Sequence, residues 1–356
     1  MLPFAVMAFL LLSGAMSGAS AQSSEPTQPS APAAANSASP SQQLAAPASQ
    51  PLPPAMEQQS PATDQNPVAQ PANPDDQGTM FVFKKQVEEV VLHATVYDAD
   101  RRLVSGLDRS AFTVSEDGKP QTITSFRRED VPVAIGVVVD NSGSMRDKRE
   151  DVNRAVLNLV RASNSEDQVF VVNFSQNFYL DQDFTSNVNL LQAALHQVSA
   201  TGSTALYDAI VASAAHLDNN HQLEKKVLLV ITDGQDNMSQ QTLREAMRKL
   251  QQANGPTVYA IGLLGSGLQQ SGREALQQLA AATGGVAYFP DSLDQVDSIT
   301  RSVARDIRSQ YMIAYKPNRQ NAQPDYQSLK VEAHAPGYGP LTVRTRRGYY
   351  QPESKH

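Results

Sequence analysis

The sequence predicts a doubly wound α/β fold, in which helices cover both faces of a largely parallel sheet, with β-strand segments on either side. Residues 131–309 alternate short apolar runs with stretches of helical periodicity, which is typical of successive βαβ units. The first run, residues 133–139, is unbroken and rich in β-branched side chains. Such a run indicates a strand that is buried on both faces, as in the middle of a parallel sheet.

The remaining elements follow from periodicity and from turn residues. Residues 178–184 favour an antiparallel edge strand. Gly284-Gly285 is expected to end the helix at residues 276–283. Further strands are expected at residues 169–174, 227–232, 257–261 and 286–289, and helices at residues 152–160, 190–198, 205–217, 243–250, 276–283 and 296–307.

The two flanks carry strand patterns instead, at residues 79–130 and 310–356. Three or four strands in each flank are too few to bury a stable core alone. We therefore hypothesise that both flanks form one β-sandwich, into which the α/β domain at residues 131–309 is inserted.

The N-terminal part of the chain is expected to be a leader followed by a spacer. Residues 4–12 are apolar and precede Ala19-Ser20-Ala21, the pattern of a signal peptide at residues 1–21. Because no Lys or Arg precedes the apolar run, an upstream start or a retained anchor stays open. Residues 22–78 are rich in Pro, Ala, Ser and Gln and are expected to be a disordered linker. These features predict an exported protein, in the periplasm, at the cell surface or secreted, without a membrane-spanning segment in the mature chain.

Composition limits the chemistry. The 356 residues include no cysteine, and the formal net charge is −7, which argues against nucleic acid or an anionic membrane as the main partner.

Oxygen-bearing side chains follow two of the expected buried strands. Asp140, Ser142 and Ser144 alternate directly after the first strand, and Asp233 follows the strand at residues 227–232. Thr204 lies in a glycine-containing loop that opens a helix. Carboxylates and hydroxyls suit Mg²⁺, Ca²⁺ or Mn²⁺. The first loop alone would be equally typical of a helix cap.

The combination of these five residues resembles the von Willebrand factor A domain, in which they form the metal-ion-dependent adhesion site. The resemblance implies a Rossmann-like fold with strand order 3-2-1-4-5-6, which places the strands of Asp140 and Asp233 side by side. It also implies that Ser142, Ser144 and Thr204 approach the cation directly, while the two carboxylates often act through water. The arrangement of the flanks, including G-L-D-R-S-A-F-T-V-S-E-D-G at residues 106–118 and R-T-R-R-G-Y-Y at residues 344–350, is similar to an exported VWFA-related family that is abundant in acidobacteria. With it, the resemblance covers about residues 85–350.

These residues predict an adhesion or scaffold module that binds a protein partner through Mg²⁺, with Ca²⁺ or Mn²⁺ as alternatives. Two carboxylates would balance the ion, and an Asp or Glu carboxylate of the partner would take an open coordination position. The candidates for direct contact with the partner lie on the surrounding loops: Asn141, Gly143, Met145, Ser203 and Gln235.

Three other functions stay open: a metal-dependent hydrolase, a domain whose metal is purely structural, and an assembly subunit that works with an ATPase. A hydrolase needs a base beside the metal. No histidine lies in the motif loops, and Asp208 and Asp236 are the nearest candidates, so we expect no enzymatic activity. The basic residues near the C-terminus, Arg344, Arg346 and Arg347, are interpreted as a docking surface or as charges that protect an edge strand.

Overall fold

The computed structural model describes residues 89–128, 130–196, 200–220, 222–263, 269–317 and 326–351. The expected signal peptide and linker lie outside these residues, as does the end of the helix expected at residues 190–198. The described residues fall in one compact unit of the chain. Among their helices, none has both the length and the apolar character that a membrane crossing would require.

A six-stranded sheet forms the centre of the α/β domain. Its strand order is β10-β9-β8-β5-β6-β7, and all neighbours are parallel except β7, which pairs antiparallel with β6. When the strands are numbered within the domain and read from β7 to β10, this order is 3-2-1-4-5-6, as the family resemblance implied. The strands are β5 (Val133–Asp140), β6 (Gln168–Phe174), β7 (Phe178–Thr185), β8 (Lys225–Thr232), β9 (Thr257–Gly262) and β10 (Ala287–Tyr288).

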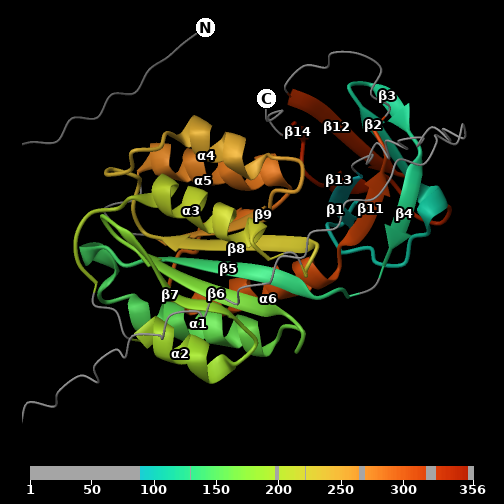
Figure 1. Ribbon diagram of the computed structural model, residues 1–356. Helices are drawn as coiled ribbons and strands as arrows, with labels where there is room; N and C mark the ends of the chain where they lie inside the picture. Colours follow the sequence, from blue (N-terminus) through green and yellow to red (C-terminus); the bar gives the residue numbers. More distant parts are fainter. Residues whose placement is uncertain are drawn as a thin grey trace, which may run out of the picture. The chain divides into compact units, whose positions relative to one another are not determined.

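Helices cover both faces of this sheet (Figure 1). On one face lie α3 (Leu206–Asp218), α4 (Leu243–Leu250) and α5 (Gln270–Thr283), and on the other lie α1 (Arg149–Arg161), α2 (Val188–His196) and α6 (Asp294–Arg308). Each face has its own hydrophobic cluster, because successive residues of a buried strand point to opposite sides. The α5 helix ends at Gly284, whose φ of 84° is the left-handed conformation that glycine adopts readily.

Strands from both flanks form the two sheets of a β-sandwich. Their orders are β13-β1-β11-β4 and β14-β12-β2-β3, so each sheet combines strands from before and after the α/β domain. A shared hydrophobic cluster fills the space between them. This pairing confirms the hypothesis that the flanks complete one another. The strands are β1 (Val90–Tyr97), β2 (Phe112–Glu116), β3 (Lys119–Gln121), β4 (Ile123–Arg127), β11 (Tyr311–Tyr315), β12 (Tyr326–Ala333), β13 (Thr342–Arg344) and β14 (Gly348–Tyr350).

The junction between the sandwich and the α/β domain contains a buried carboxylate, Asp306 of α6, which is 3% exposed. It pairs with Arg344 of β13 and accepts hydrogen bonds from Thr95 and Tyr97 of β1 and from Tyr259 of β9. Hydrogen bonds and charge therefore join α6 to three other elements, β1, β9 and β13.

Two of the three basic C-terminal residues, Arg344 and Arg346, make internal contacts, which corrects both interpretations for these two. Arg344 is paired with Asp306, and Arg346 is 6% exposed. The Arg346 guanidinium donates to the backbone carbonyls of Gln252, Ala253 and Gly255. Two of the three arginines are therefore internal hydrogen-bond donors, and only Arg347 is an exposed charge.

Candidate metal centre

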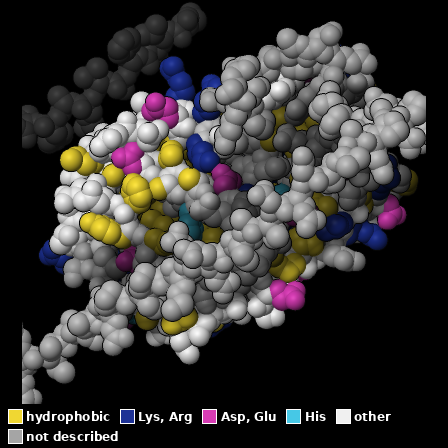
Figure 2. Space-filling model, viewed as in Figure 1, with side chains coloured by type: hydrophobic (Ala, Val, Ile, Leu, Met, Phe, Trp, Pro, Cys, Tyr) yellow, Lys and Arg dark blue, Asp and Glu magenta, His cyan; other side chains and the backbone are white. Residues whose placement is uncertain are grey.

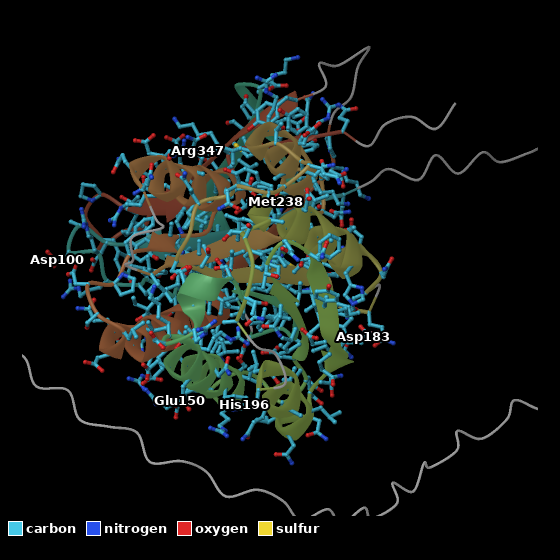
Figure 3. The ribbon with its side chains drawn as sticks, turned by 90° about the vertical axis from the view of Figure 1, so that its left-hand side faces the viewer. Asp100, Glu150, Asp183, His196, Met238 and Arg347 are labelled. Atoms are coloured by element: carbon cyan, nitrogen blue, oxygen red, sulfur yellow. The ribbon has the colours of Figure 1, made fainter. Side chains whose placement is uncertain are left out.

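The five predicted metal ligands meet where the parallel strands of the α/β domain end. Asp140 is the last residue of β5, Asp233 directly follows β8, and these two strands are neighbours. Thr204 lies just before α3, while Ser142 and Ser144 lie at a 3-10 turn, Gly143–Met145. Figure 3 faces this end of the sheet, with Met238 labelled on one of its loops. Such an end of an open α/β sheet is where ligands usually bind.

Asp140 is fully buried and is held by neutral donors. Thr232 donates its hydroxyl to Oδ2 at 2.6 Å, and the backbone N–H of Ser142 donates to Oδ1 at 2.8 Å. Burial raises the pKa of Asp140, the hydrogen bonds from Thr232 and Ser142 oppose this rise, and the nearby Asp233 charge adds to it. A carboxylate in this environment is costly to ionise and gains most from a nearby cation.

The hydroxyls of Ser142 and Ser144 connect the first loop to Asp233. The two Oγ atoms are 3.2 Å apart, and Ser144 donates to Asp233 Oδ1 at 2.7 Å. Asp233 has no exposed surface. Three of the predicted ligands thus form one continuous set of oxygen atoms.

Thr204 lies beside the other predicted ligands because Gly234, which has no side chain, leaves room for it next to Asp140. A Cβ atom on Gly234 would lie 3.2 Å from Thr204 Oγ1 and 3.9 Å from Asp140 Oδ2. Asn237 fixes the backbone of Thr204, because each residue accepts a hydrogen bond from the other's N–H, at 2.9 and 3.0 Å. A side chain at position 234 would therefore fill the space beside these ligands.

Backbone hydrogen bonds hold the loops in register. Asn141 accepts from the N–H of Thr201 at 2.8 Å, and Gly143 donates to the carbonyl of Gly202 at 3.2 Å. Gly202 has a φ of 86°, which favours glycine at this turn. These bonds fix the positions of the hydroxyl groups before any ligand binds.

The donor set fits a hard divalent cation. Two carboxylates and three hydroxyls supply only oxygen, as Mg²⁺, Ca²⁺ and Mn²⁺ prefer. Over the described residues, no group of three or more His, Cys, Asp or Glu side chains is placed to hold a metal. A metal at this centre would therefore depend on hydroxyl ligands as much as on charge.

Sequence reasoning missed three residues of the centre. Lys148 forms an ion pair with Asp233, Thr232 orients Asp140, and Asn237 holds Thr204. Thr232 precedes Asp233 directly, and Lys148 follows the serine motif by four residues, so proximity to the motif was the available signal. Asp208 and Asp236, the candidate bases, instead accept backbone N–H groups of Gln240, Gln241 and Tyr207.

Two of the five predicted partner contacts are corrected by burial. Met145 has no exposed surface and packs in the hydrophobic core, and Asn141 is only 4% exposed. Gly143 is exposed, whereas Ser203 and Gln235 are half-buried, so these three remain accessible on the loops.

Exposed apolar side chains lie beside the centre. Met238, 57% exposed, follows Asn237, and Phe178, 45% exposed, follows a turn that is bonded to Ala205. Tyr179 and Leu180 continue this exposed segment, at 57% and 47%. In the space-filling view, hydrophobic side chains at the left-hand end are interspersed with charges of both signs (Figure 2).

One family model and several solved structures are similar to parts of this chain. No curated protein sequence matches the chain. Solved structures that resemble it include BatB from Bacteroides thetaiotaomicron, with 17% identity over 49% of this chain and 98% of that chain and a TM-score of 0.40. A von Willebrand factor type A protein from Catenulispora acidiphila has 13% identity, covers 76% of each chain and gives a TM-score of 0.43.

A third similar structure is proximal thread matrix protein 1 from the mussel byssus, described with a zinc-occupied metal-ion-dependent adhesion site. Its identity is 18%, over 53% of this chain and 48% of that chain, with a TM-score of 0.43. The sequence model of the von Willebrand factor type A domain matches residues 135–235, a range that holds all five predicted metal ligands. This part of the α/β domain is therefore similar to the von Willebrand factor type A domain.

Proposed function

We propose that this domain binds a divalent cation, Mg²⁺ in the first place, and uses it to hold an acidic side chain of a protein partner. The observation that carries the proposal is the convergence of Asp140, Ser142, Ser144, Thr204 and Asp233 at one end of the sheet, with only oxygen donors. The cation would supply positive charge to which an Asp or Glu carboxylate coordinates.

The surroundings favour a protein partner. Ser144 and Gly143 are exposed, so the serine loop opens to solvent. The apolar side chains of Phe178, Tyr179 and Met238 provide contact area next to it, and aromatic and Met side chains are enriched at protein interfaces. Export, inferred from the pattern of residues 1–21, is part of the proposal and would place the partner outside the cytoplasm.

Binding rather than catalysis is proposed, because the nearest candidate bases already have other partners. Asp208 accepts two backbone N–H groups and Asp236 accepts from Tyr207 and Ser239. Both carboxylates therefore hold the loops in place.

Thermal unfolding with and without metal tests the cation site. Chelator-treated protein is titrated with Mg²⁺, Ca²⁺ or Mn²⁺ and compared with Asp140→Ala and with Asp147→Ala, which removes an exposed carboxylate of the same loop. An ion at a hundred times its dissociation constant should stabilise wild type by about 2.7 kcal/mol. The shift should persist in D147A and vanish in D140A. Equal curves with and without every ion would contradict the proposal.

The carboxylate bridge is tested separately with Mn²⁺-loaded protein. A short peptide that contains Asp should displace a metal-bound water and lower the water-proton relaxation rate, and the matched Asn peptide should not. An unchanged rate with both peptides, when metal binding itself is intact, would indicate a structural metal and contradict the bridge.

A further inference from the structure

Lys148 places a positive charge within the candidate metal centre. Its ammonium forms an ion pair with Asp233 Oδ2, while Ser144 donates to Oδ1 of the same carboxylate. The Asp233 side chain has no exposed surface, whereas the Lys148 side chain is 18% exposed. Both oxygen atoms of one predicted ligand are therefore already engaged by the protein itself.

The two carboxylates of the centre are compensated differently. Asp140 accepts hydrogen bonds from a hydroxyl and a backbone N–H, both neutral, and the nearby charge of Arg149 adds to them. Asp233 has the cationic partner. Because a buried carboxylate without a counter-charge is strongly unfavourable, Lys148 gives Asp233 the charge balance that a bound cation would otherwise supply.

The backbone at Lys148 is fixed, but the side chain is able to leave. The Lys148 N–H donates to the carbonyl of Met145 at 2.9 Å, and its own carbonyl accepts from Val152 at 3.1 Å. Its side chain makes no capping hydrogen bond to α1. A lysine stem is flexible and its ammonium is readily hydrated, so the group is able to turn to solvent when another cation reaches Asp233.

A divalent cation and this ammonium compete for one carboxylate. If Lys148 remains in place, its charge repels the metal at short range, where effective dielectric screening is weak. If Lys148 leaves, the energy of its ion pair is lost. In either case the metal binds less tightly than it would beside an uncharged residue.

We propose that Lys148 is a built-in competitor of the metal: it stabilises the metal-free domain and lowers the affinity of the centre for a divalent cation. The proposal rests on the function proposed above. Its consequence is a centre that stays folded without metal and fills when the cation concentration is high or when a partner's carboxylate adds its own negative charge.

The test compares Lys148→Gln with Arg146→Gln. Arg146 is exposed and lies in the same loop, so both variants lose one positive charge, but only K148Q removes the contact with Asp233. Mn²⁺ binding is measured by electron paramagnetic resonance and Mg²⁺ binding by calorimetry, on the whole mature chain. We expect K148Q to bind both ions about tenfold more tightly than wild type, or more, and R146Q to remain within about twofold because its charge is screened by solvent.

Melting in chelator provides a second readout. K148Q should melt at a lower temperature than wild type without metal, since Asp233 loses its counter-charge, and should show the larger upward shift with Mg²⁺. If K148Q folds only with metal, its melting temperature as a function of Mg²⁺ concentration gives the dissociation constant. Equal metal affinity in K148Q and wild type would overturn the inference and leave the proposed function intact. Failure of all variants to bind metal would instead overturn the proposed function.

Discussion

Asp233 and Asp306 are both buried acids with a basic partner, yet their surroundings differ. Asp306 pairs with Arg344 and also accepts from three hydroxyl groups, those of Thr95, Tyr97 and Tyr259. Asp233 accepts from one hydroxyl and one lysine. The first carboxylate is saturated by donors from elements that cannot separate without unfolding. The second has donors that can be exchanged for a metal ion.

Burial alone therefore does not identify a functional carboxylate. At the junction, burial and the charge of Asp306 raise the pKa of Tyr97 to about 12, so its hydroxyl remains a donor over the physiological range. At the candidate metal centre, the neighbours of Asp233 are the hydroxyl groups of the serine loop and the Lys148 ammonium. A buried carboxylate that is surrounded by other oxygen acceptors and has too few hydrogen-bond donors indicates a site for a cation. A buried carboxylate with a full set of donors indicates a structural role.

The largest expected effect comes from breaking the junction. Asp306→Asn keeps the size of the side chain but leaves the Arg344 guanidinium, 22% exposed, without its counter-charge. Removing one partner of a buried pair typically costs about 3–5 kcal/mol. Urea unfolding in the presence of chelator measures this loss.

The control is Asp291→Asn, an exposed carboxylate close to the start of α6, which should change stability by no more than about 0.5 kcal/mol. If D306N lowers the free energy of unfolding by less than about 1 kcal/mol, the junction carboxylate behaves like a surface ion pair. That result would contradict the contrast drawn with Asp233.

The sequence indicated more of the metal centre than of the junction, for a physical reason. The five ligands lie in short loops directly after buried strands or before a helix, so parallel-sheet geometry places them together. Thr95, Asp306 and Arg344 meet only because strands from both flanks pair, and Thr95 and Asp306 are 211 positions apart in the sequence. No local pattern specifies that meeting.

A weaker signal for Asp306 was present. Val303 and Ile307 are buried residues of α6, and Asp306 shares their face of the helix. A charged residue in a buried register requires a partner, although the sequence does not name it. For Lys148, helical spacing gave no such warning, because the residue precedes α1 and reaches Asp233 across two loops.

A smaller change in the free energy of unfolding is expected when the pH is lowered, because of His93 in β1. Burial and the positive charges of Lys225 and Arg346 lower the pKa of His93 from 6.5 to about 3. In the unfolded chain His93 binds a proton below about pH 6.5, whereas in the folded protein it remains neutral down to about 3. Folding is therefore favoured fully above pH 6.5, and the stability that neutral His93 contributes is lost as pH falls through this window.

Solvent and nearby acidic side chains reduce the change in unfolding free energy that His93 causes. His93 is partly exposed and lines a cavity with Glu89 and Glu224, so we expect about 0.5–1 kcal/mol per pH unit, below the limit of ~1.4 for one full proton. Unfolding of wild type and His93→Gln by urea at several pH values between 6.5 and 4 measures the difference. Parallel pH profiles for the two proteins would contradict a neutral His93.

The smallest effect is expected from Asp233→Asn in metal-free protein. The amide keeps an acceptor for Ser144, and Lys148, which loses its partner, has a flexible stem that is able to turn its ammonium to water. The loss of stability in chelator should therefore be about 1 kcal/mol or less, well below that of D306N. With saturating Mg²⁺ the difference from wild type should grow, because only wild type gains stability from the ion. If D233N is instead as unstable as D306N without metal, both acids are structural. The replaceable donors around Asp233 would then have no bearing on function.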